Sequence, residues 1–331
     1  MSSAVALSAS ASMAGASRLA RPMRHVFQPG RSSGSTPPPL VILVHGLESF
    51  SGTWDGVMAR IAAQPPPSPS LLAVDLRGHG YTPPGPEDEY TPASLAADVV
   101  ALAVAHGARA SQPCVLVGHS MGGRVAMRAA ADNPEILRHV VVEDMDCRPR
   151  GPEMSAKFDY DAIRAFEPSG DSPAAVADAL VDAMPSVMDA ERVRGYVARG
   201  RVLAAPGGRA VSLVQPLGFA LAYDRILASR DGSDAMRRLA EYEPARRPGI
   251  HLWRADPDAG EGEGENGGGS SAAEKGEGGV EWMMGLDGVE WNVHDAVFVG
   301  AGHSVHNTRQ EAFVEAINAL AFRDSPAPER A

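Results

Sequence analysis

The strongest constraint on the fold is an alternation between short apolar, β-branched runs and segments with helical spacing. The apolar runs lie at 40–45, 71–80, 114–118, 139–144, 249–256 and 294–303. Helical spacing is found at 53–63, 91–106, 121–132 and 308–322. Thr53 and Thr91 are expected N-caps, and Pro92 suits a first helical turn. Strands joined through helices need crossover connections, so the sequence predicts an α/β fold with a mostly parallel sheet flanked by helices.

Two stretches interrupt this alternation and divide the chain. Residues 149–248 are helical and punctuated by prolines, which predicts an inserted helical cap between two parts of the core, at 40–148 and 249–323. Residues 259–279 are glycine-rich and acidic, and we expect a disordered surface insertion there. A flexible N-terminal segment is expected at 1–39, in which "MRHVF" is an edge-strand candidate, and a short tail at 324–331.

Charge and cysteine content narrow the possible partners and compartments. The 331 residues carry a formal net charge of -11 with a pI near 5.4. This charge disfavours nonspecific binding to nucleic acid or to anionic membranes. The longest apolar stretches are too short and too interrupted to span a bilayer. Two cysteines, Cys114 and Cys147, are too few for a disulfide framework and fit a reducing compartment.

The N-terminal segment has the composition of a targeting peptide. Four arginines, in a background of alanine and serine, precede Glu48, the first acidic residue. An Arg-rich, Ser-rich and acid-poor leader is typical of organellar transit peptides. We therefore expect import into a mitochondrion or a chloroplast. The alternative is a disordered extension that carries no targeting signal, on a cytoplasmic protein.

The letters GHSMG at 118–122 match G-x-S-x-G and stand where an apolar run changes to helical spacing. A strand-to-helix turn is the setting in which this motif lifts a serine out of a sheet. Gly118 and Gly122 avoid side-chain collisions in such a turn, and Gly123 lets the helix approach the sheet. Ser120 is therefore the candidate nucleophile.

A nucleophilic serine needs a base, and the oxyanion that its attack creates needs backbone N–H donors. His303 follows the last apolar run and is the candidate base, with His306 as its rival. Met121, after the serine, and Leu47, in the loop after the first central strand, are the candidate oxyanion donors. The two histidines spell H-x-x-H, but no HExxH motif, cysteine cluster or third fixed ligand accompanies them. We expect neither a metal nor a cofactor.

Four motifs together, "VILVHGL", "VDLRGHG", "VGHSMGG" and "GAGHSVH", resemble the α/β-hydrolase fold family over residues 40–322. More narrowly, the chain is similar to a branch of small esterases and thioesterases that includes bacterial acyl-CoA-type esterases and mitochondrial ABHD11-like hydrolases. That branch often has Trp after the catalytic histidine, where this chain has Ser304. We expect the helical cap to form the acyl pocket, for which 160–166 and 213–224 offer apolar side chains. Core packing is the commoner use of such segments.

The resemblance leaves two positions for the acid that orients the histidine. The general family pattern places it after the penultimate strand, at Asp256. The narrower branch places it after the strand that follows the nucleophile helix, which selects Asp144. We prefer Asp144, because an insertion directly after the Asp256 loop makes that loop a poor place to hold a carboxylate accurately. Glu143 and Asp146 are expected to make helix-cap or solvent contacts.

The sequence thus predicts a serine hydrolase that cleaves a carboxylic ester or thioester of a small molecule through an acyl-enzyme intermediate. Ser120 attacks, His303 shuttles the proton and Asp144 holds the imidazole. The alternatives are acyl transfer to an acceptor other than water, and ligand perception with little or no turnover by a receptor of the same fold. The acyl chain, the leaving group and the oligomeric state are left open.

Overall fold

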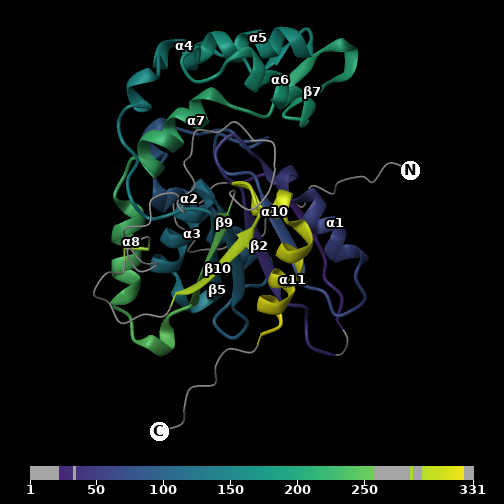
Figure 1. The fold of residues 1–331 in the computed structure, drawn as a ribbon, viewed down its shortest axis with the longest axis vertical. Helices are drawn as coiled ribbons and strands as arrows, with labels where there is room; N and C mark the ends of the chain where they lie inside the picture. The colour runs from purple at the N-terminus through teal and green to yellow at the C-terminus, as the bar shows by residue number, and fades with distance from the viewer. Residues whose placement is uncertain (1–21, 33–34, 257–283, 286–292, 324–331) are drawn as a thin grey trace.

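The computed structural model describes residues 22–32, 35–256, 284–285 and 293–323. Within them, seven strands form one sheet in the order β1-β3-β2-β4-β5-β9-β10 (Figure 1). Neighbouring strands are parallel, apart from β1 beside β3. The strands are β1 His25–Gln28, β2 Leu40–Val44, β3 Ser70–Val74, β4 Cys114–His119, β5 Leu137–Glu143, β9 Gly249–Asp256 and β10 His294–Val299.

The mostly parallel sheet is confirmed, and the edge strand indicated by "MRHVF" is present as β1. The predicted insertion at 259–279, the tail at 324–331 and residues 1–21 of the predicted leader lie outside the described residues.

Helices cover both faces of the sheet (Figure 1), which explains why its central strands are apolar along their whole length. Every residue of β2 and of β4 is buried. The core on one face includes side chains of α2 and α3, with α8 packed on α3, and the core on the other face includes α1 and α11. The helices are α1 Asp55–Ala63, α2 Pro92–Ala105, α3 Met121–Asp132, α8 Asp231–Ala240, α10 Val305–Thr308 and α11 Gln310–Ala321. In the described part of the chain, no helix combines the length and apolarity that a bilayer crossing requires.

The two predicted helix caps have different outcomes. Thr91 accepts a hydrogen bond from the Ser94 N–H at 3.1 Å, and Pro92 is the first residue of α2, as expected. Thr53 does not cap α1, because that helix begins at Asp55 after a 3-10 turn, Ser51–Trp54. The hydroxyl of Thr53 instead contacts a histidine near the end of the chain.

Between β5 and β9 the chain builds a separate layer, here called the cap, which lies above the sheet in Figure 1. The cap consists of α4 Tyr160–Ala165, α5 Pro173–Ala183, α6 Ala190–Ala198 and a small antiparallel sheet of β6 Ser169–Gly170, β7 Val202–Ala204 and β8 Ala210–Ser212. It has a hydrophobic core of its own, which includes Leu180, Met188, Tyr196 and Phe219. After α7 Pro216–Ala222 and a π-helical turn, Tyr223–Leu227, the chain returns to the main core, where α8 packs against α3.

Candidate active site

The turn after β4 holds Ser120 in a backbone conformation that residues with a side chain rarely adopt. Its angles are φ 50° and ψ −119°, and such strain costs about 1–3 kcal/mol and clusters at functional sites. A Cβ added at Gly118 would lie 2.2 Å from the carbonyl oxygen of Gly122, and one added at Gly122 would lie 2.5 Å from that of Val44. Only glycine fits on either side of this serine, as the sequence indicated.

Hydrogen bonds fix the serine on both sides. Its N–H donates to the Glu143 carbonyl at 2.8 Å, and its own carbonyl accepts from the Gly123 N–H at 2.8 Å. Met121 is the first residue of α3. N–H groups of a first helical turn have no partner within the helix and carry the positive end of its dipole. The Met121 N–H therefore has no hydrogen-bond partner within the helix, and it can stabilise negative charge beside Ser120.

His303 and Asp144, which are distant in sequence, form a hydrogen-bonded pair. Nδ1 of His303 lies 2.6 Å from Oδ2 of Asp144, a short N–H···O hydrogen bond, as a carboxylate acceptor favours. The Ala255 N–H donates to the other carboxylate oxygen at 3.1 Å. The Asp144 side chain is 0% exposed, whereas that of His303 is 40% exposed. A proton on Nδ1 makes Nε2 the basic nitrogen of an accessible imidazole.

The structure favours Asp144 over Asp256 as the partner of this histidine. Asp144 has φ 47°, and its N–H donates to the Trp253 carbonyl at 2.7 Å. This bond holds Asp144 between the ends of β5 and β9, where its carboxylate hydrogen-bonds His303. Asp256 is the last residue of β9, and its backbone carbonyl accepts from the Gly300 N–H at 2.9 Å.

The loop after β2 passes directly beside the nucleophile. A Cβ added at Gly46 would lie 3.1 Å from the Cβ of Ser120. His45 orients the next peptide, because its Nδ1–H donates to the Gly46 carbonyl at 2.7 Å while its Nε2 accepts from the Leu76 N–H at 3.0 Å. Burial keeps the pKa of His45 well below its usual value, which preserves this neutral form. Since the C=O and N–H of a trans peptide point in opposite directions, the Leu47 N–H points away from His45.

A second histidine–carboxylate pair lies next to the first and is completely buried. Nδ1 of His306 lies 2.8 and 3.0 Å from the two carboxylate oxygens of Glu143, and its backbone N–H donates to one of them at 2.9 Å. Nε2 of His306 hydrogen-bonds Thr53 Oγ1 at 3.0 Å. Both members of the pair are 0% exposed. The expectation that Glu143 makes a helix-cap or solvent contact is therefore wrong.

His119 lies between the two pairs. Its Nε2–H donates to the His303 carbonyl at 3.0 Å, and its ring centroid is 4.8 Å from that of His303 and 4.9 Å from that of His306. Burial and, secondarily, these two neighbours keep the pKa of His119 well below its usual value, so the ring is neutral. Its hydrogen bond holds the loop that carries His303 close to the elbow.

The described residues include one group of metal-ligand type, His119, Glu143 and His306, whose ligand atoms lie within 4.8 Å of one another. Both carboxylate oxygens of Glu143 already accept from His306 Nδ1. A cation bound to this carboxylate would compete with the His306 N–H groups that it accepts from, and the geometry fits a hydrogen-bonded pair better than a metal centre.

The expectation for Asp146 is also wrong, because this residue is buried and ion-paired. It lies 2.6 Å from Arg148, 3.0 Å from Arg150 and 3.4 Å from the fully buried Arg124. Burial raises the pKa of its carboxyl, but the three guanidinium groups outweigh this and hold the pKa below its usual value. Asp146 thus anchors the chain where it leaves β5 for the cap.

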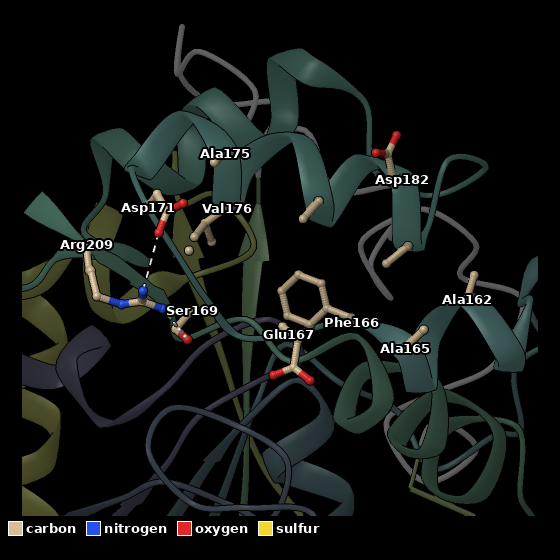
Figure 2. Close-up of a pocket in the computed structure, with 13 residues that line it drawn as sticks. Ala162, Ala165, Phe166, Glu167, Ser169, Asp171, Ala175, Val176, Asp182 and Arg209 are labelled. Carbon is tan, nitrogen blue, oxygen red and sulfur yellow. Dashed lines mark hydrogen bonds and ion pairs between the residues drawn. The ribbon is translucent and has the colours of Figure 1, made fainter.

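A cavity of about 600 Å³ opens in the cap, and Figure 2 shows the residues that line it. Phe166 lies among them, and Asp171 and Arg209 form an ion pair at 3.3 Å in its wall. Ala162, Ala165 and Phe166 belong to the segment predicted for an acyl pocket and do line this cavity. None of the candidate catalytic residues contributes to its walls.

The sheet order, the strained serine at a strand-to-helix turn and the adjacent histidine–carboxylate pair define a class of α/β proteins with a nucleophile elbow. Residues 41–316 match the family model described as "Alpha/beta hydrolase family". The chain belongs to this family.

Curated relatives share parts of the sequence. The chain is 32% identical to the mouse sn-1-specific diacylglycerol lipase ABHD11 over 32% of this chain and 33% of that protein. It is 35% identical to the 2-(acetamidomethylene)succinate hydrolase of Mesorhizobium japonicum over 34% of this chain and 37% of the enzyme. These matches span little more than a third of the relatives' length. Lipase LipV of Mycobacterium tuberculosis is 29% identical over 60% of this chain and 82% of the lipase.

Solved structures share the whole fold. A marine microorganism esterase superposes with a TM-score of 0.61 at 16% identity and covers 89% of this chain and 97% of its own. The thioesterase domain from the curacin biosynthetic pathway gives a TM-score of 0.56 at 18% identity, covering 90% of this chain and 99% of the domain. At such identities the likeness shows the fold alone.

Proposed function

We propose that this protein is a serine hydrolase that cleaves a carboxylic ester or thioester of a small molecule. The observation that carries the proposal is the 2.6 Å hydrogen bond between His303 Nδ1 and the buried carboxylate of Asp144, in a protein whose strained elbow presents Ser120. The names of two curated relatives, both lipases, support acyl hydrolysis.

In the proposed reaction, Ser120 Oγ attacks the acyl carbon while His303 Nε2 takes the hydroxyl proton. Asp144 keeps the other nitrogen protonated and stabilises the imidazolium that forms. The N–H groups of Leu47 and Met121 stabilise the tetrahedral oxyanion. Its collapse breaks the bond to the alcohol or thiol, which leaves with the proton from His303. Water then attacks the acyl-enzyme with His303 as base, which releases the carboxylic acid and restores Ser120.

The proposal is tested with a panel of short-chain and long-chain p-nitrophenyl esters and acyl thioesters. We expect the wild type to hydrolyse at least one member of the panel. Ser120→Ala should be at least about 10³-fold slower, because it lacks the hydroxyl that attacks the acyl carbon. Ser111→Ala, at an exposed serine, is the control and keeps wild-type activity. Ser120→Ala turning over as fast as the wild type would contradict the proposal.

A further inference from the structure

Glu48, which follows the candidate oxyanion donor Leu47, reaches from the core to the cap. Its carboxylate accepts hydrogen bonds from the guanidinium of Arg192 and the hydroxyl of Tyr196. Both partners lie on α6, four residues apart and therefore on one helix face. Arg192 Nε also donates to the Tyr196 hydroxyl at 2.9 Å. Only 11% of the Glu48 side chain and 22% of the Arg192 side chain are exposed, so the contact is a largely buried ion pair.

Glu48 holds this contact in a strained backbone conformation. Its φ is 63°, a left-handed value that costs a residue with a side chain about 1–2 kcal/mol and that glycine adopts freely. Burial and then the charge of Glu48 raise the pKa of Tyr196, so the phenol stays protonated and donates. The two partners on α6 give a physical reason for a charged residue at a position that backbone preference alone would assign to glycine.

The loop that contains Leu47 is held at both ends. On the core side, His45 orients the Gly46 carbonyl through a 2.7 Å hydrogen bond. On the cap side, Glu48 is bound to α6. The Leu47 side chain packs against both the main core and the core of the cap. The Leu47 N–H, the candidate oxyanion donor, therefore lies between a contact in the core, made by His45, and a contact with the cap, made by Glu48.

We propose that Arg192 and Tyr196, acting through Glu48, position the Leu47 N–H for the oxyanion, so that the cap takes part in the chemical step. They are positioning residues, since none of them touches the reacting atoms. The inference rests on the proposed hydrolase function. It makes the oxyanion site depend on helix α6, which comes from a different layer than the nucleophile.

A second core-to-cap contact, more exposed than the first, provides a control. Arg164 of α4 binds Glu87 of the core through two hydrogen bonds, 2.8 and 3.0 Å long. Glu87 lies in the turn Glu87–Glu89, in a different loop from Glu48. Loss of this pair removes a cap contact without touching the loop after β2.

The experiment compares Glu48→Gln and Arg192→Met with Glu87→Gln. We expect kcat to fall by about 10- to 100-fold in the first two, since one oxyanion donor is worth up to 10³-fold, with KM within about twofold. The double variant Glu48→Gln/Arg192→Met should be no slower than the slower single variant. Affinity for a trifluoromethyl ketone, whose adduct with Ser120 carries an oxyanion, should fall in parallel with kcat. Glu87→Gln should match the wild type in all of these.

Loss of one partner of a buried ion pair also destabilises a protein, so thermal midpoints are measured alongside. Tyr196→Phe, which removes only a hydroxyl, is the second variant if Glu48→Gln does not fold, and a smaller loss of kcat with unchanged KM is expected. Equal kcat and equal ketone affinity in the wild type and the folded α6 and Glu48 variants would overturn the inference while the hydrolase function stands. A wild type that hydrolyses no ester or thioester would overturn both.

Discussion

The pairs His303–Asp144 and His306–Glu143 come from the same two segments of the chain but lie in different surroundings. Glu143 is the last residue of β5. Asp144 follows it in a left-handed conformation, with φ 47°, and its side chain goes to a different histidine. Asp144 reaches an imidazole that is 40% exposed, whereas Glu143 reaches one that is 0% exposed. Each pair joins an imidazole Nδ1 to a carboxylate, but Nε2 of the buried His306 is bound to Thr53. Exposure of the imidazole therefore separates the candidate catalytic pair from the structural one.

Replacement of the carboxylate in the exposed pair should have the largest effect. In Asp144→Asn the side-chain amide can donate to Nδ1, which selects the wrong tautomer of His303 and removes the charge that stabilises its imidazolium. We expect kcat to fall by about 10³- to 10⁴-fold with a small change in KM. Steady-state kinetics on the best ester of the panel measure this. Asp256→Asn is the control, and a larger loss there than in Asp144→Asn would assign the acid to Asp256.

The same replacement in the buried pair should act mainly on stability. Glu143→Gln weakens the hydrogen bonds to His306 in a fully buried pair, and we expect the free energy of unfolding to fall by about 2–3 kcal/mol. Because the folded variant still presents Ser120 and His303, its kcat should fall by no more than about tenfold. Urea unfolding and kinetics on the same preparation separate the two effects. A 10³-fold loss of kcat without a loss of stability would mean that the buried pair is catalytic.

The smallest effect on activity concerns pH, where buried histidines should change the stability of the fold and leave kcat unchanged. Burial lowers the pKa of His79 to about 4, that of His139 to about 4 and that of His251 to about 3. An unfolded histidine titrates near 6.5, so below that pH the unfolded chain binds more protons than the folded one. Stability should therefore fall as pH drops from about 6.5 to 4, by up to about 1.4 kcal/mol per pH unit for each such histidine.

Urea unfolding at pH values from 7.5 to about 4.5 measures this slope. His79→Gln removes one titrating group. It should therefore reduce the slope of unfolding free energy against pH by the contribution of about one proton, which is up to about 1.4 kcal/mol per pH unit. A slope that stays the same in this variant would show that His79 is protonated in the folded protein.

The fold and the elbow could be predicted because their signals are local. Unbroken apolar strands indicate a sheet that is covered on both faces, and the glycines around Ser120 fit one kind of turn. His303 and Asp144 were placed by their positions after strands, since the carboxyl ends of parallel strands meet at one edge of the sheet. The family resemblance was needed to prefer Asp144, whose carboxylate lies 2.6 Å from His303 Nδ1; its role as the acid stays a prediction.

Residues whose role depends on a distant partner were misjudged or missed. Glu143 and Asp146 carry charge at the end of an apolar run, a signal that each needs a buried partner, but the sequence does not say which one. Thr53 resembles an N-cap by its local context, yet it hydrogen-bonds His306, more than 250 positions away. No local pattern distinguishes Glu48, because its partners belong to the cap.

Labelling with a fluorophosphonate tests the central claim most directly, because the probe reacts far faster with an activated serine than with an ordinary hydroxyl. We predict that peptide mass mapping places the adduct on Ser120, that His303→Asn is labelled at least about 10³-fold more slowly than the wild type, and that His306→Asn, if folded, is labelled within about tenfold of the wild-type rate. An adduct on a different serine, or equally fast labelling of His303→Asn and the wild type, would contradict the account.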